Sequence, residues 1–165
     1  NSRNNSGLTV LMLACKSGDL KTIEILINNG AQLELKDRYG KTALIHAAAN
    51  GNENVINLLL YKGAKVDITD RSEWSPLMWA IKNKKYKSAK VLILHGADIN
   101  HKDDEGTHLI HYAVHKKSLK LIKLLINAKV NLKAKDQYGL TALVYALKNK
   151  NKEIVDLIKD AGGSY

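Results

Sequence analysis

The order of apolar and polar residues over positions 37–69 predicts two short helices behind a turn. The stretch DRYGKT is polar and rich in turn formers, and Thr42 at its end is suited to start a helix. The stretch TALIHAAAN, over 42–50, then carries small and apolar residues, and Gly51 can take the left-handed conformation that ends a helix. The stretch NENVINLLLYK, over 52–62, gathers its apolar residues on one side and predicts an amphipathic second helix.

The same plan recurs along the chain with a period of 33 residues. The period relates the aspartates Asp37, Asp70, Asp103 and Asp136, and it also relates the alanines Ala14, Ala47, Ala80, Ala113 and Ala146. It divides the sequence into five repeats, over approximately 4–36, 37–69, 70–102, 103–135 and 136–165. Because one such repeat cannot bury its apolar face alone, neighbours must stack on one another. We therefore expect residues 1–165 to form a single repeat domain.

The motifs GKTALIHAAANG, WSPLMWA and HGADIN resemble the ankyrin repeat, and the resemblance covers essentially the whole chain. It implies an all-α solenoid of stacked helix-turn-helix units joined by β-hairpin fingers. It further implies a module that binds another protein in a concave groove, without catalysis and without a cofactor. The fold hosts many partners, so the sequence does not name the one bound here.

Several positions depart from the family pattern. Where the family has the glycine that ends the first helix, repeats three to five have Lys84, Lys117 and Lys150, so we expect these lysines to be held left-handed at a cost of about 1 kcal/mol each. Glu73 replaces a turn glycine in the same way. Lys159 stands at an apolar position of the last helix, which suits a solvent-facing end. The first repeat has no such polar residue, so we expect either further N-terminal sequence, with the chain a fragment of a longer protein, or self-association.

Composition limits the partners and the compartment. The net charge is +10, which favours an anionic partner, although nearly all the cations are lysines rather than the arginines that nucleic-acid recognition prefers. One cysteine, Cys15, excludes an internal disulfide. No signal peptide or apolar run of about 18 residues is present, so no transmembrane segment is expected. We expect an intracellular protein, cytoplasmic or nuclear.

The resemblance also implies where a ligand would contact the chain, at finger tips and at exposed positions of the first helices. The tenth residue of successive repeats is aromatic three times, which predicts a ladder of rings, and lysines near the inter-helix turns predict a basic ridge for an acidic segment of the partner. We expect Tyr39, Trp74 and Tyr138 on the finger tips. The predicted partner-binding residues are Tyr39, Trp74, Trp79, Lys82, Tyr112, His115, Lys116, Tyr138, Tyr145 and Lys148.

Three alternatives remain open at this point. The basic surface could bind nucleic acid or an anionic membrane, or the array could be a structural spacer. Trp74, Trp79 and Tyr112 are also similar to ankyrin domains of certain histone lysine methyltransferases that read methylated lysine, but Lys82 stands where those domains have an acid. His111 and His115 have helical spacing, yet no acid or cysteine completes a metal site, and Cys15 occupies a small-residue packing position. We expect neither metal nor catalysis.

Overall fold

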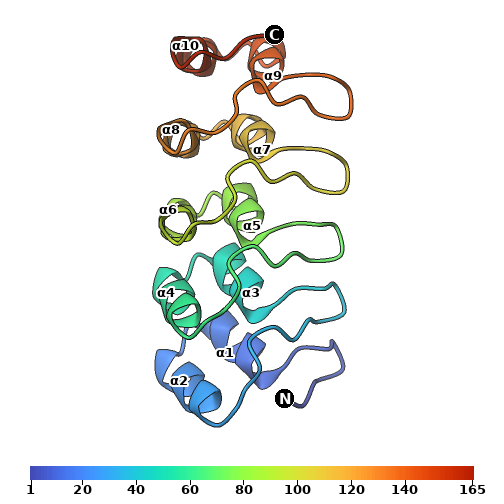
Figure 1. Ribbon diagram of the computed structural model, residues 1–165, viewed down its shortest axis with the longest axis vertical. Helices are drawn as coiled ribbons and strands as arrows, with labels where there is room; N and C mark the ends of the chain where they lie inside the picture. The colour runs from blue at the N-terminus through green and yellow to red at the C-terminus, as the bar shows by residue number, and fades with distance from the viewer. The chain divides into compact units, whose positions relative to one another are not determined.

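The computed structural model describes all residues, 1–165, and contains ten α-helices arranged as five pairs (Figure 1). Within each pair the two helices are antiparallel neighbours joined by a short turn, and an extended finger precedes the first helix of the pair. This is the all-α helix-turn-helix architecture that the sequence predicts. The helices are α1 (Val10–Ser17), α2 (Leu20–Asn28), α3 (Ala43–Asn50), α4 (Glu53–Tyr61), α5 (Pro76–Lys82), α6 (Tyr86–Leu94), α7 (Leu109–His115), α8 (Leu119–Asn127), α9 (Ala142–Lys148) and α10 (Lys152–Asp160).

Local signals set the bounds of the first helices. The Thr42 hydroxyl accepts a hydrogen bond from the Ile45 amide at the start of α3, and Gly51 ends that helix with a φ of 89°. Helix α5 starts in the same way, since the Ser75 hydroxyl accepts from the Met78 amide and Pro76 occupies the first turn, where its missing N–H costs nothing. The caps that the sequence predicts for 42–50 are therefore confirmed.

Lysine takes the place of glycine where the sequence analysis expects it. Lys84, Lys117 and Lys150 have φ values of 56°, 52° and 52°, inside the left-handed region that L-residues disfavour. Glu73, with a φ of 58°, does the same in a finger turn. These positions keep the glycine conformation although the side chain opposes it, so the surrounding turn imposes the backbone geometry.

The fingers contain less β-structure than expected. Only isolated antiparallel bridges form, between Arg3 and Thr9, Lys102 and His108, and Lys135 and Thr141. The fingers are instead held by the residue at the base of each turn, Asn4 in repeat one and an aspartate in repeats two to five, whose side chain accepts backbone N–H groups. Asp37 Oδ1, for example, accepts from Tyr39 and Lys41 at 2.8 and 2.9 Å. Because one carboxylate satisfies two amides, a longer ladder of strand hydrogen bonds is unnecessary here.

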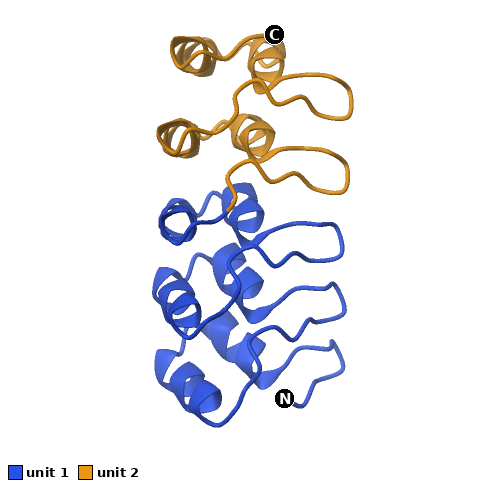
Figure 2. Cartoon of the chain, in the orientation of Figure 1, with its two compact units in different colours: residues 1–97 blue, residues 98–165 orange.

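Contacts divide the chain into two compact units, residues 1–97 (unit 1) and 98–165 (unit 2) (Figure 2). In unit 1, helix α3 packs between α1 and α5, while α4 packs against α6. Fully buried alanines, among them Ala47 and Ala80, let the first helices approach closely. In unit 2, α7 packs on α9 with Ala113 and Ala146 buried in the same way.

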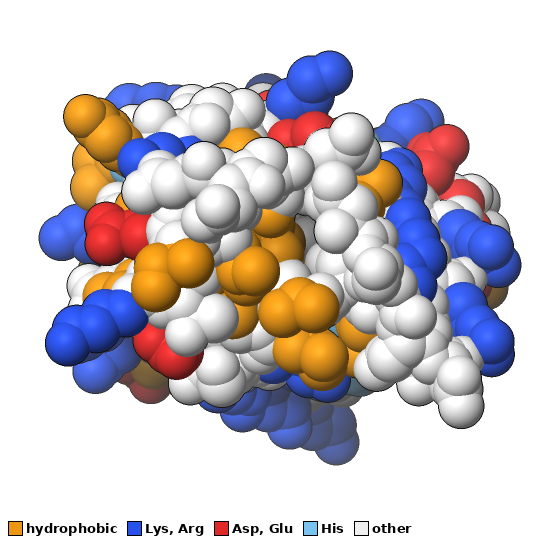
Figure 3. Space-filling view, turned by 90° about the horizontal axis from the view of Figure 1, so that it is seen from below, with side chains coloured by type: hydrophobic (Ala, Val, Ile, Leu, Met, Phe, Trp, Pro, Cys, Tyr) orange, Lys and Arg blue, Asp and Glu red, His pale blue; other side chains and the backbone are white.

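The two terminal repeats differ in what they expose. Val10 and Leu13 on α1 and Leu20 on α2 are exposed apolar residues. Figure 3 views the molecule from the side on which these helices lie and shows apolar side chains grouped among polar ones. Lys159 on α10 is exposed, as the sequence predicts, while its neighbour Ile158 is fully buried.

Candidate partner-binding site

A side-chain hydrogen bond joins finger to helix in each of repeats two to five. The residue nine positions after the finger aspartate, on the first helix, carries a polar hydrogen that is donated to the second carboxylate oxygen. We call this pair the finger latch. The pairs are His46 Nε2 to Asp37 at 2.8 Å, Trp79 Nε1 to Asp70 at 2.8 Å, Tyr112 Oη to Asp103 at 2.5 Å and Tyr145 Oη to Asp136 at 2.5 Å.

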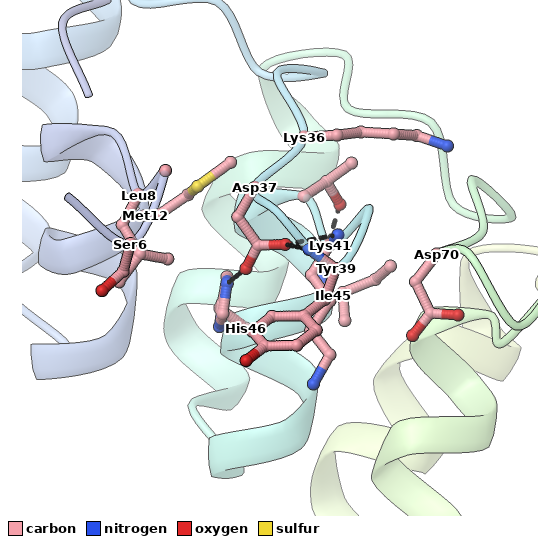
Figure 4. Close-up of polar contacts among 12 residues, drawn as sticks. Ser6, Leu8, Met12, Lys36, Asp37, Tyr39, Lys41, Ile45, His46 and Asp70 are labelled. Carbon is pink, nitrogen blue, oxygen red and sulfur yellow. Dashed lines mark hydrogen bonds and ion pairs between the residues drawn. The ribbon is translucent and has the colours of Figure 1, made fainter. Parts of the chain in front are cut away.

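Figure 4 shows the latch of repeat two, with the Asp37 carboxylate held at once by His46 and by two backbone amides of its own turn. Desolvation of Asp37 acts to raise its pKa, but hydrogen bonds from Lys41, His46 and Tyr39 outweigh it, so the pKa is lowered. Burial in turn lowers the pKa of His46 below its ordinary value, with Asp37 acting against that shift. The pair at neutral pH is thus a carboxylate accepting from a neutral imidazole.

The latch changes the interpretation of the aromatic ladder. The ladder residues Trp79, Tyr112 and Tyr145 do share a register. Each is partly buried, however, and donates its one side-chain hydrogen bond to the aspartate of its own finger. Their remaining ring faces, rather than free N–H or O–H groups, are what a ligand could contact. An aromatic face of this kind contributes mainly buried area and cation–π attraction.

Trp74 does not stand on an exposed finger tip, which corrects the expectation from sequence. Its residue is only 9% exposed. The Trp74 backbone amide donates to Asp70 Oδ1 at 3.0 Å, and its ring packs on Trp79 with 5.1 Å between ring centres and an interplanar angle of 52°. Trp74 thus packs against Trp79, the ring whose N–H forms the latch of this repeat.

In unit 1, a pocket of about 350 Å³ opens beside this tryptophan pair. It is lined by Tyr39, Lys41, Asp70, Arg71, Ser72, Trp74, Trp79 and Lys82. The ammonium of Lys41 lies 3.6 Å from the centre of the Trp79 ring, and that of Lys82 lies 4.3 Å from Trp74 and 4.8 Å from Trp79. The chain's own cations thus occupy the indole faces. This weighs against the methyl-lysine hypothesis, because a second cation would be repelled.

In unit 2, a pocket of about 250 Å³ has a different character. It is lined by Glu105, Thr107, His111, Tyr112, His115, Asp136, Gln137, Tyr138 and Tyr145. His111 Nε2 lies 3.1 Å from the Leu140 carbonyl, and its ring meets Tyr145 edge-on at 5.8 Å. The Asp136 hydrogen bond, followed by burial, raises the pKa of Tyr145 to about 12. Tyrosine faces and acids therefore dominate this second pocket.

Comparison of the sequence with models of known protein families agrees with this repeat architecture. A family model described as ankyrin repeats (3 copies) matches residues 1–70 and 77–164. The chain belongs to the ankyrin-repeat family. A search of curated proteins gives no match. Ankyrin repeats are in general protein–protein interaction modules, and the resemblance stated from the motifs is confirmed at this level.

The other predicted site residues of this ankyrin chain lie at several depths. Tyr39 and Tyr138 stand on finger tips, 70% and 72% exposed. In the ridge, His115 and Lys148 are exposed and Lys116 is partly buried; the Lys148 ammonium lies 5.7 Å from the Tyr145 ring centre. No side-chain hydrogen bond or ion pair joins these three residues to one another.

Sequence reasoning missed two of the three cations that line the unit 1 pocket, Lys41 and Arg71. Both had a usable signal. Arg71 directly follows the finger aspartate Asp70, and Lys41 lies four residues after Asp37, at the position whose amide the aspartate holds.

The residues considered for metal binding and for thiol reactivity can be placed in the structure. No group of three or more His, Cys, Asp or Glu residues in the chain is arranged to hold a metal ion. His108, considered with His111 and His115, places its Nδ1 3.0 Å from the Asn100 carbonyl. Cys15 is fully buried, and desolvation raises the pKa of its thiol to about 12. No helix is both long enough and apolar enough to span a bilayer.

Proposed function

We propose that this ankyrin-repeat chain is a non-catalytic module that binds a partner protein or peptide through its fingers and first helices. The support comes from the combination of exposed and fixed aromatics. Tyr39 and Tyr138 project from the finger tips, and each lines a pocket whose wall is a latched ring, Trp79 in unit 1 or Tyr145 in unit 2. Such anchors beside concave surface are typical of interaction hot spots.

The finger latches support binding in a second way. Each finger carries two or more hydrogen bonds to one aspartate, as in the Asp136 group, which accepts from Tyr138, Leu140 and Tyr145. A finger held like this loses little conformational freedom when a ligand arrives, and pre-organisation of this kind raises affinity without new contacts. We also place an acidic segment in the partner, because Lys41, Arg71 and Lys82 line the unit 1 pocket and the chain carries a net charge of +10.

Selection of random displayed peptides on the full chain tests this proposal. Tyr39→Ala and Tyr138→Ala remove exposed side chains and should leave the fold intact, and Tyr61→Ala is the matched control because Tyr61 on α4 is 84% exposed and lies outside both pockets. Peptides selected on the parent chain should lose about tenfold in affinity for at least one finger variant, or roughly 1.4 kcal/mol. They should bind Tyr61→Ala unchanged.

The rival ligands enter the same assay. A mixed-sequence oligonucleotide and anionic vesicles would each bind with steep salt dependence if the basic surface were the functional feature. If they bind tightly while no peptide is selected, or if Tyr61→Ala loses as much as the finger variants, the proposal is wrong.

A further inference from the structure

Three cations, Lys41, Arg71 and Lys82, line the unit 1 pocket, and none of them forms a salt bridge. The ion pairs within the chain join His46 to Asp37 and Lys87 to Glu53. The side chains of Lys41, Lys82 and Arg71 take part in neither, and they donate no side-chain hydrogen bond to the protein. Their N–H groups thus remain available on the wall of a pocket that has the volume of a small-ligand site, about 300–1,000 Å³.

The one acid in this pocket is already used. Asp70 Oδ1 accepts from the amides of Ser72 and Trp74, both at 3.0 Å, and Oδ2 accepts from Trp79 Nε1 at 2.8 Å. These bonds point its oxygens into the finger turn and the latch. Asp70 lowers the positive potential of the pocket, but three cations surround a single carboxylate, so the pocket stays positive.

The position of the ammonium groups adds a second observation. Lys41 and Lys82 both lie over the Trp79 ring, at 3.6 and 4.8 Å from its centre. Partial burial, and to a smaller extent the charge of Lys82, lower the pKa of Lys41, although Asp70 and Asp37 act in the opposite direction. An anion placed between the two ammonium groups would relieve their repulsion and use their free hydrogens.

We infer that the unit 1 pocket binds one anionic side chain of the partner, a carboxylate or a phosphate, between Lys41, Lys82 and Arg71. The inference rests on the proposed function, because the anion is a side chain of the bound protein. It also separates the two pockets, since the unit 2 pocket is lined by Glu105 and Asp136 and offers no lysine or arginine to such a group.

The test uses small probes, so that it does not depend on finding the partner. Glutamate, phosphoserine and glutamine, each with an acetylated amino group and an amidated carboxyl group, are titrated into the ¹⁵N-labelled full chain at constant ionic strength. The signal followed is the indole N–H of Trp79. The variants are Lys41→Gln and Lys82→Gln, which remove charge from the pocket. Lys90→Gln is the control, because Lys90 is exposed on α6 and does not line the pocket.

The glutamate or the phosphoserine probe should shift the Trp79 indole signal, and the tighter of the two identifies the anion. Each pocket variant should weaken binding about fivefold, the size of one partly exposed ion pair. Lys90→Gln should bind as the parent chain does. Equal shifts from the glutamine probe, no shift from either anion, or equal weakening in Lys90→Gln would each overturn the inference. The proposed function fails separately, when the peptide selection yields no ligand for the finger surface.

Discussion

Replacing Lys117 with glycine measures how much free energy the left-handed backbone conformation of this lysine costs the fold. The residue is exposed, its φ is 52°, and its amide donates to the Val114 carbonyl at 2.9 Å. An L-residue in this conformation costs about 1–2 kcal/mol, whereas glycine pays nothing for it. Against this, glycine makes the unfolded chain more flexible, which lowers the free energy of unfolding by about 0.4–1 kcal/mol. The replacement Lys117→Gly should therefore stabilise the fold by roughly 0.5–1 kcal/mol.

The neighbouring residue provides a matched control. Lys116 has a φ of −74°, which any residue adopts, so Lys116→Gly removes the same charge but relieves no strain. It should destabilise the fold by about 0.5–1 kcal/mol through chain entropy and lost packing. Urea unfolding followed by circular dichroism measures both variants, and the slope of free energy against urea should stay unchanged while the midpoint moves. If Lys117→Gly is no more stable than Lys116→Gly, the strain assigned to the left-handed lysines is wrong.

Three further predictions follow from burial and from the latches. Cys15 should resist thiol reagents in the folded chain, and its labelling rate should track global unfolding, since a pKa of about 12 leaves almost no thiolate at neutral pH. Burial lowers the pKa values of His46 and His111, so the free energy of unfolding should be highest above about pH 6.5 and should fall as the pH drops below it. A His111→Gln variant should show a weaker dependence of this free energy on pH, and an unchanged dependence would count against this assignment. Trp79→Phe leaves one Asp70 oxygen without its donor and should cost about 1–3 kcal/mol in urea unfolding, and a loss near zero would show that the latch contributes little.

The sequence predicted what depends on short stretches of chain. The caps of the helix over 42–50 follow from the residues at its two ends, and the left-handed lysines follow from their register with Gly51, one to three periods earlier. The period itself ties these local features into one architecture, because a single repeat cannot bury its apolar face alone. The fold class could therefore be deduced before any coordinates.

The candidate site was only partly predictable. The shared register of Trp79, Tyr112 and Tyr145 could be read from the sequence. The latch, however, requires the finger to fold back so that residues nine positions apart meet, and the 33-residue period does not predict that contact. A signal did exist, because His, Trp and Tyr at this register all carry a polar hydrogen opposite an aspartate. Trp74 was assigned to an exposed tip although the period relates it to Lys41, whose amide the finger aspartate holds, and not to the tip residue Tyr39.

The most direct test of the proposed function maps a bound ligand onto the chain. A peptide obtained from the selection is added to the ¹⁵N-labelled full chain, and backbone and indole N–H shifts are recorded. We predict that the largest shifts fall on the finger residues and on the Trp79 indole. Shifts confined to the second helices α2, α4 and α6, with the Trp79 indole unmoved, would contradict the proposed binding surface.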